Sequence, residues 1–299
     1  MNAIEIRNLS KSFRGMYAVD KLNMTVPQGA IYGFIGENGS GKSTTEKLIC
    51  GHLVPDGGEI KLFGKAHSDA GVRMRVGALI ENAGCFPNSS VYANLMMQAL
   101  NLGIENRDEE IKRVLKIVRM EDSARIKFKS CSLGMKQRIG IAMALLGDPA
   151  LLILDEPING LDTDGMRIMR EILVDITQNL GCTVLISSHI LGELEKIATH
   201  YGIIRQGKMI QELSAEEMDA RSRTFVSLKT NDDAKAMSIL KSMNYDVRQE
   251  EELRVYDVDD AEEIVDCLLR NELAVSEIKK NKIGLEEYYI GLMSQKEGK

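Results

Sequence analysis

The 299-residue chain has no apolar run of the roughly 18 residues that crossing a bilayer requires. It also has no tract rich in proline, glycine and serine, and charged residues make up only 27% of it against 44% hydrophobic ones. Such a composition excludes long disorder and predicts a folded chain. The length allows one main domain and an accessory domain, and we expect any membrane role to come through a partner.

Cysteine is scarce, and the five cysteines show no paired spacing: Cys50, Cys85, Cys131, Cys182 and Cys267. This dispersed, odd set is typical of a reducing cytosol and argues against a zinc motif. The opening residues MNAIEIRNLSKSF alternate as in a strand, so we expect no signal peptide. Basic residues are outnumbered by acidic ones, with a net charge of -6, which disfavours a nucleic-acid surface.

Apolar strands and helical patterns alternate along the first two thirds of the chain. Short strand-like segments precede residue 82, and residues 82–150 show helical periodicity. Continuous apolar segments return at 151–155 and 183–187, followed by a hairpin with its turn at Gln206 and Gly207. Because apolar strands separated by helices indicate a sheet that is buried on both faces, we predict a largely parallel sheet with an inserted helical block.

Two helices of this block have recognisable signals. Ser89 and Ser90 are candidate caps before VYANLMMQALNLG. The second helix is predicted over 107–120, where one face carries Ile111, Val114, Leu115 and Val118.

The last third of the chain has a different order of elements. Residues after about 218 alternate as strand, helix, two strands, helix, strand and a final helix. The order βαββαβ predicts a small ferredoxin-like α+β domain over 219–299, beside a main domain over 1–218. Its role stays open between a dimer contact, a stabilising lid and a regulatory or partner-binding module.

A phosphate-binding loop is indicated by GENGSGKST, which follows an apolar strand and precedes a helix. Gly36, Gly41, Lys42 and Ser43 satisfy the spacing G-x-x-x-x-G-K-[ST]. Glycines at these positions let backbone N–H groups point at phosphate oxygens. Lys42 would reach the β- and γ-phosphates and the Ser43 hydroxyl would bind Mg²⁺, which leaves kinases, GTPases and ATP-driven motors as candidates.

Polar side chains follow the two later apolar strands. Asp155 ends the strand-like LLILD and Glu156 follows it, and His189 ends TVLISSH. We expect Asp155, on a strand beside the phosphate-loop strand, to contact Mg²⁺, Glu156 to polarise water and His189 to face the γ-phosphate. The alternatives are an acid pair that only caps the next turn and a surface histidine.

A helix that begins at Ser132 is predicted by CSLGMKQRIGIAMALLGDP, which ends at Gly147 and Pro149. A hydroxyl, a glycine and free N–H groups at its start form a possible anion site. The alternative is an ordinary capped amphipathic helix.

Together these segments resemble the ATP-binding subunits of ABC transporters from about residue 4 to 213. GENGSGKST is similar to the Walker A loop, LLILDEP to Walker B, SLGMKQR to the signature motif, NGLD to the D-loop and SSH to the switch histidine. The resemblance implies a P-loop NTPase fold with an N-terminal antiparallel β subdomain and a helical subdomain at about 82–150. It implies ATP and Mg²⁺ as ligands.

The family's functional positions carry over as follows. Catalytic roles fall on Lys42, Glu156 and His189. Mg²⁺ ligands fall on Ser43, Glu81 and Asp155. Nucleotide contacts fall on Phe13, Gly36, Glu37, Asn38, Gly39, Ser40, Gly41, Lys42, Ser43, Thr44, Ser132, Gly134 and Asp162. Phe13 stands where the family stacks an aromatic ring on adenine, although an aromatic residue there fits a core position equally.

Two positions depart from the family pattern. Glu81 replaces the usual glutamine, which adds negative charge beside the γ-phosphate, and Leu133 replaces the usual glycine of the signature. ALIENAGCFPNSSVYANL and CSLGMKQRIGIA resemble segments of the ATP-binding subunits of bacitracin-resistance and lantibiotic-immunity exporters. The subunits of related sodium and multidrug exporters share parts of these two segments.

The resemblance also implies partners. Each ATP would lie between the Walker A loop of one chain and the signature of another, which predicts a dimer, as a homodimer or with a paralogue. A separate transmembrane permease would dock near residues 81–94 and hold the chain at the inner face of the membrane. The rivals are a soluble ABC protein that acts on ribosomes or DNA, and a small-molecule kinase, against which the signature and D-loop residues count.

Overall fold

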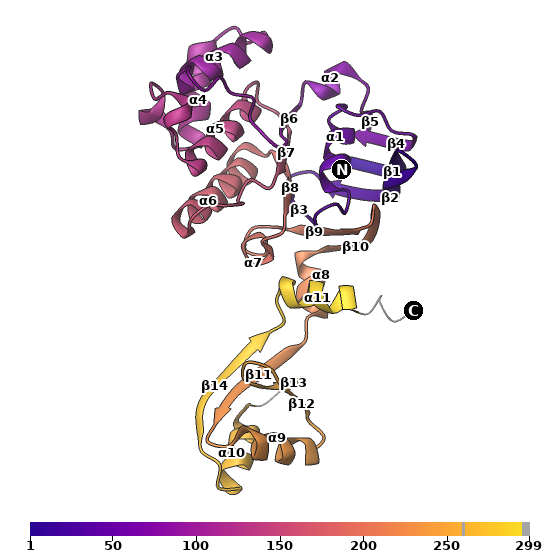
Figure 1. The fold of residues 1–299 in the computed structure, drawn as a ribbon, viewed down its shortest axis with the longest axis vertical. Helices are drawn as coiled ribbons and strands as arrows, with labels where there is room; N and C mark the ends of the chain where they lie inside the picture. The colour runs from indigo at the N-terminus through magenta and orange to yellow at the C-terminus, as the bar shows by residue number, and fades with distance from the viewer. Residues whose placement is uncertain (259–260, 295–299) are drawn as a thin grey trace. The chain divides into compact units, whose positions relative to one another are not determined.

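The computed structural model describes residues 1–258 and 261–294 (Figure 1). It divides into two compact units, residues 1–215 and 216–299. No helix among the described residues combines the length and the apolar character that a membrane crossing requires.

The first unit is built on a six-stranded sheet in the order β10-β9-β3-β8-β7-β6. Its strands are β3 (Ile31–Ile35), β6 (Val76–Leu79), β7 (Leu151–Asp155), β8 (Thr183–Ser188), β9 (His200–Arg205) and β10 (Lys208–Ser214). All neighbours are parallel except β10, which pairs antiparallel with β9 through the predicted turn at Gln206 and Gly207. Side chains of β3 and β8 are buried along their whole length, as predicted for a sheet covered on both faces.

One strand neighbour differs from the prediction. We expected β7 to lie beside the phosphate-loop strand β3, and this is wrong because β8 lies between them. The chain leaves β7, runs through helix α6 (Thr163–Leu180) and returns to pair on the inner side. The strand that leads to His189 is therefore the direct neighbour of both the loop strand and the strand that ends in Asp155.

A second sheet of the first unit is antiparallel, in the order β2-β1-β4-β5, as the family resemblance implied. It contains β1 (Asn2–Phe13), β2 (Met16–Pro27), β4 (Gly57–Leu62) and β5 (Lys65–Ala66). Side chains from this sheet, from helix α1 (Lys42–Ile49) and from β3, β7 and β8 form one buried apolar cluster. The phosphate-loop helix is therefore fixed between two sheets.

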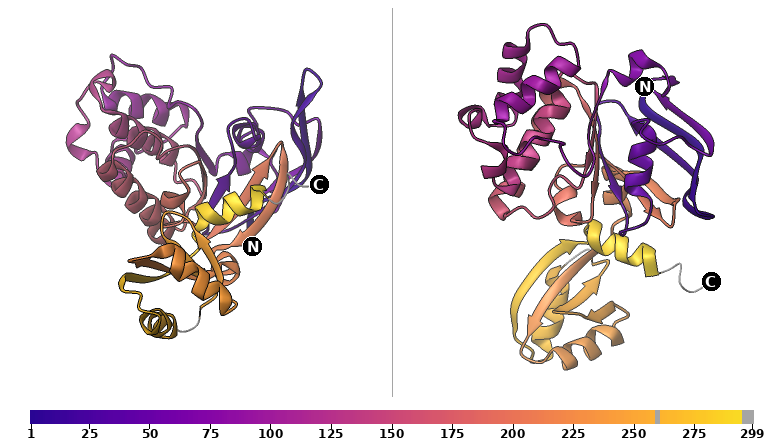
Figure 2. Two further views of the ribbon diagram at one scale, coloured as in Figure 1. Left: turned by 60° about the horizontal axis from the view of Figure 1, so that its bottom comes forward. Right: turned by 45° about the horizontal axis from the view of Figure 1, so that its top comes forward.

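Helices occupy the predicted insert on the opposite side of the six-stranded sheet (Figure 2). They are α3 (Val91–Asn101), α4 (Arg107–Ile117) and α5 (Leu133–Leu145), with 3-10 turns at Glu121–Ser123 and Phe128–Ser130. The short α2 (Ala70–Arg73) precedes the insert, and its Val72 packs in the apolar cluster between the two sheets. Ser90 caps α3 by accepting a hydrogen bond from the Ala93 N–H. Helix α4 ends three residues before the predicted end, because Arg119 takes a left-handed φ of 57°.

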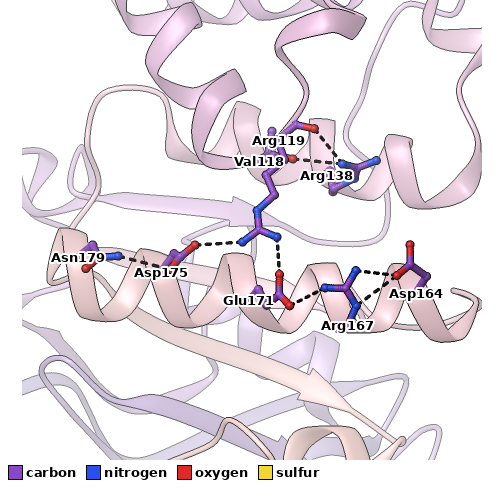
Figure 3. A network of polar contacts seen from close by, with 8 residues as sticks. All are labelled: Val118, Arg119, Arg138, Asp164, Arg167, Glu171, Asp175 and Asn179. Carbon is purple, nitrogen blue, oxygen red and sulfur yellow. Dashed lines mark hydrogen bonds and ion pairs between the residues drawn. The ribbon is translucent and has the colours of Figure 1, made fainter.

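Arg119 also joins the helical insert to α6 (Figure 3). Its guanidinium group contacts the carboxylates of Glu171 and Asp175 on α6. On its other side, Arg138 of α5 donates to the Arg119 carbonyl at 3.0 Å. Arg167 continues the chain of ion pairs from Glu171 to Asp164 at the start of α6. Helices α5 and α6 are therefore tied through the end of α4.

The second unit has the predicted βαββαβ order. It contains β11 (Thr224–Thr230), α9 (Asp233–Ser242), β12 (Asp246–Gln249), β13 (Leu253–Tyr256), α10 (Ala261–Arg270), β14 (Val275–Lys282) and α11 (Leu285–Ser294), and the short α8 (Ala215–Arg221) leads into it. The four strands form one antiparallel sheet in the order β12-β13-β11-β14. Apolar side chains of α9 and α10 form a core with this sheet, as expected for a ferredoxin-like module.

Gly77 controls how closely α5 approaches the sheet. A Cβ atom at Gly77 on β6 would lie 2.0 Å from the Ala144 carbonyl oxygen of α5. We expect Gly77→Ala to lower the free energy of unfolding by about 1–3 kcal/mol through overpacking. Thermal denaturation checks this, with Gly192→Ala as the control because a Cβ at Gly192 meets open space. Equal melting temperatures for the two variants would contradict the close contact.

Candidate functional site

The loop between β3 and α1 has the tight curl that phosphate binding requires. Gly41 has a φ of 111°, and a Cβ there would lie 2.4 Å from the Ala18 carbonyl oxygen. A Cβ at Gly36 would lie 2.5 Å from the Ile204 carbonyl oxygen. A side chain at either glycine would therefore collide with neighbouring backbone, so both glycines of the predicted motif have a steric reason.

Lys42 lies across this loop. Its side chain is almost buried, and the ammonium group donates to the carbonyl oxygens of Gly36 at 2.6 Å and Glu37 at 3.2 Å. No side chain caps the start of α1, so the first N–H groups of the helix add to the positive potential there. The ammonium group and these N–H groups form a site suited to an anion.

A cavity of about 250 Å³ opens at this loop. It is lined by Ala18, Asn38, Gly39, Gly41, Lys42, Ser43, Thr44, Asp155 and Glu156. The structure therefore brings most of the predicted loop residues together with both acids of β7. Ser40 and Glu37 shape the loop from within, through a hydrogen bond from the Ser40 N–H to the Glu37 carbonyl at 3.1 Å.

Asp155 connects three segments of the site. Its carboxylate accepts hydrogen bonds from the Ser43 hydroxyl on α1 at 3.1 Å and from the Ser187 hydroxyl on β8 at 2.8 Å. Asp155 and Ser187 are direct partners in the β7–β8 register. The predicted pair of metal ligands, Ser43 and Asp155, is thus already held together by hard oxygen donors of the kind Mg²⁺ prefers.

Glu156 and His189 meet at the ends of β7 and β8. The His189 Nδ1 atom lies 2.7 Å from the Glu156 Oε2 atom. Glu156 has a φ of 50°, and its N–H group donates to the Ser187 hydroxyl at 3.1 Å. A left-handed backbone is costly for a residue with a side chain, so a strained turn directs the carboxylate here. The two expected catalytic side chains are therefore in contact.

The signature segment forms a different site. Ser132 caps α5 by accepting a hydrogen bond from the Met135 N–H at 3.3 Å, as predicted. Leu133, 49% exposed, points toward the D-loop, where a Cβ on Gly160 would lie 3.0 Å from it. Asp162 caps α6 through the Gly165 N–H at 2.8 Å. A second cavity, of about 360 Å³, includes Ser132, Gly134 and Asp162 in its lining.

The predicted site residues thus fall into two groups within one chain. The linings of the two cavities share no residue among those the structure describes. Phe13 lies at the end of β1, 46% exposed, with the Lys11 ammonium group 5.6 Å from its ring. The Glu81 carboxylate lies 2.6 Å from the Lys47 ammonium group of α1 and does not line the loop cavity.

Sequence reasoning missed two residues of the loop site. Ser187 is buried in an apolar strand and links Asp155 to the Glu156 backbone. Glu46 is fully buried on α1, although its neighbours Leu48 and Ile49 fill the core with apolar side chains. A hydroxyl within an apolar strand and a carboxyl within a buried helix were visible in the sequence, but only the fold brings them to Asp155.

Comparison with known proteins identifies the class. The family model described as ABC transporter matches residues 19–159. The bacitracin transport ATP-binding protein BcrA of Bacillus licheniformis is 35% identical over 297 residues, which covers 97% of each chain. The lantibiotic transport ATP-binding protein SrtF of Streptococcus pyogenes is 39% identical over 209 residues, which covers 70% of this chain and 90% of that protein.

This chain therefore belongs to the ATP-binding proteins of the ABC transporter family, and it is an ATPase of that family. The subgroup resemblance drawn from the sequence is confirmed by its bacitracin and lantibiotic relatives.

Solved structures confirm the fold. The cbiO1 protein of Clostridium perfringens, part of the ABC transporter complex cbiONQ, has a TM-score of 0.67 at 26% identity. That similarity covers 74% of this chain and 91% of cbiO1. The ATP-binding cassette MJ0796, in a dimeric post-hydrolysis state bound to ADP and Pi, has a TM-score of 0.65 at 21% identity and covers 71% of this chain and 98% of that one.

The Ser187 hydroxyl should be needed for turnover, because it positions both Asp155 and the Glu156 backbone. We expect Ser187→Ala to lower the kcat for ATP by about 10–100-fold, the range for losing a residue that orients functional groups, with nucleotide affinity little changed. Steady-state ATPase kinetics and nucleotide titration measure the two effects. Ser188→Ala is the matched control, because the Ser188 hydroxyl accepts from the Ile190 N–H instead. Equal kcat values in both variants would argue against this role.

Proposed function

We propose that this chain binds and hydrolyses ATP to drive an exporter that protects the cell from a bacitracin-like peptide antibiotic. The observation that carries the proposal is the end-to-end similarity to the bacitracin transport ATP-binding protein, over 97% of both chains. Similarity to the lantibiotic transport protein covers only 70% of this chain. A relative that extends over the ferredoxin-like unit favours the bacitracin type over the lantibiotic type.

The loop site is suited to phosphate chemistry. Lys42 and the N–H groups at the start of α1 provide positive charge for the β- and γ-phosphates. Glu156 is the group that would orient and polarise the attacking water, and His189, 2.7 Å from it, fixes the direction of its carboxylate. The backbone turn at Glu156 holds this pair at the edge of the loop cavity.

Mg²⁺ fits the residues that the structure brings together. Ser43 and Asp155 offer hard oxygen atoms 3.1 Å apart at the loop cavity. When bound, Mg²⁺ would neutralise charge on the phosphate oxygens. Glu81 stays a proposed ligand, although its carboxylate contacts Lys47 in this structure.

Two copies of the chain are needed to complete an ATP site in this proposal. The loop cavity and the signature cavity share no lining residue among those the structure describes. A second chain would present its Ser132 and Gly134 to the nucleotide held by Lys42 and Ser43 of the first. ATP would then hold the dimer closed and hydrolysis would release it.

The permease would dock at the join of the sheet and the helical insert. A groove of about 450 Å³ lies there, with Glu81, Cys85, Pro87, Phe128 and Leu133 in its lining. Phe86 beside it is 60% exposed, which is unusual for an aromatic side chain and suits a partner surface. Attachment to the permease would place the chain at the cytoplasmic face of the membrane.

Glu156→Gln should separate binding from turnover. We expect the variant to retain ATP affinity, to lose about 100-fold or more of its ATPase rate and to accumulate as an ATP-bound dimer. ATPase assays, nucleotide titration and size-exclusion chromatography with ATP measure the three effects. Glu121→Gln, a surface carboxylate on the 3-10 turn after α4, is the control. Hydrolysis at the normal rate by Glu156→Gln would show that another group activates water.

Deletion of the gene should change antibiotic sensitivity selectively. We expect sensitivity to bacitracin to rise about fourfold or more, with lantibiotics less affected. Minimal inhibitory concentrations of bacitracin, lantibiotics, sodium and several drugs would be measured in the deletion strain and after complementation with wild type or Glu156→Gln. Unchanged bacitracin sensitivity with raised sodium or drug sensitivity would assign a different cargo.

A further inference from the structure

Glu46 is a deeply buried acid on the phosphate-loop helix. It lies on α1, four residues after Lys42, and its side chain has 0% exposure. Neither carboxyl oxygen has a hydrogen-bond partner among the described residues. Buried carboxyl groups are normally paired or hydrogen-bonded, because removing them from water is costly. An unpaired carboxyl at this depth therefore indicates a role that the nucleotide-free fold does not fulfil.

The surroundings of Glu46 belong to the loop site. Burial, followed by the charge of Asp155, raises the pKa of Glu46 to about 8, whereas the Ser187 hydroxyl and Lys42 act in the opposite direction. Glu156 adds a smaller effect in the same direction as Asp155. Glu46 lies three residues after Ser43, so the two residues share a face of α1, and the lining of the loop cavity does not include Glu46.

Glu46 has more acidic than basic groups near it, namely Asp155 and Glu156 against Lys42. Lys42 is the cation that acts on Glu46, and its ammonium group is already bonded to two loop carbonyls. Lys47, the next residue, forms an ion pair with Glu81 on another face of the helix. The carboxyl groups of Asp155 and Glu156 thus lie near one lysine that is already bonded, and the carboxyl group of Glu46 is buried close to them. A cation in the loop cavity would balance this excess.

A packing role alone gives no reason for a carboxyl group here. Leu48 and Ile49 on the same helix are fully buried, and residues around α1 form the apolar core between the two sheets. A methionine side chain has a similar length and avoids the desolvation cost of an acid. The carboxyl group of Glu46, and not its volume, is what distinguishes it at this position.

We propose that Glu46 is a positioning residue for the divalent cation that accompanies the nucleotide, and that its carboxyl group strengthens cation binding through Ser187 and Asp155. It would act from behind the ligands and would not touch the metal itself. This inference rests on the proposed function, because it takes the loop cavity to be the site of ATP and Mg²⁺.

The test compares Glu46→Gln and Glu46→Met in the full-length chain. Binding of a fluorescent ATP analogue would be titrated in EDTA and at a series of Mg²⁺ concentrations, and direct Mn²⁺ binding would be followed by electron paramagnetic resonance. We expect both variants to need at least fivefold more Mg²⁺ for half-maximal tightening, with affinity in EDTA changed less than twofold. Glu59→Gln, which removes an exposed carboxylate paired with Lys61 on β4, is the matched control and should behave as wild type.

Thermal denaturation distinguishes this role from a structural one. Removal of an unpaired buried acid should leave the variants folded and at least as stable as wild type. Stable variants with a wild-type Mg²⁺ requirement would overturn the inference, as would variants that lose nucleotide binding equally with and without the metal. Failure of the proposed function would appear differently, because wild type itself would then bind no ATP analogue in the presence of Mg²⁺.

Discussion

The hydrogen bonds of the Asp155 carboxylate hold the loop site together. One oxygen accepts from Ser43 at 3.1 Å and the other from Ser187 at 2.8 Å, so α1, β7 and β8 are fixed to one another at a single side chain. Ser187 passes the constraint on, because its hydroxyl also accepts from the Glu156 N–H. The direction of the Glu156 carboxylate, and its contact with His189, therefore depend on the same strand pairing that positions the phosphate loop.

Much of this site was predictable, because its strongest signals are local. A glycine spacing that forces a phosphate loop, acids at the end of an apolar strand and a serine before a helix each follow from neighbouring residues. The order of strands is not local, and the expectation that β7 adjoins β3 was wrong for that reason. Ser187 and Glu46 were missed because their roles depend on which strand lies beside β7. The βαββαβ order of the second unit was predictable, since each connection there is short.

The two departures from the family pattern are accommodated by local contacts. Glu81 takes a left-handed φ of 64° and pairs with Lys47, which offsets its negative charge. Leu133 lies against Gly160, and Gly134 lies near Leu161. The leucine therefore fills space between the signature and the D-loop. Each of the two residues therefore has a specific neighbour in this fold, Lys47 for Glu81 and Gly160 for Leu133.

The network around Arg119 connects the helical insert to α6. Arg119 occupies a left-handed position at the end of α4, where glycine would be less strained, and its side chain reaches both Glu171 and Asp175. Arg138 of α5 is bonded to the same turn, and α6 begins at the Asp162 cap beside the signature cavity. The signature helix and the helix after the D-loop are therefore joined through the turn at Arg119, which lies between them.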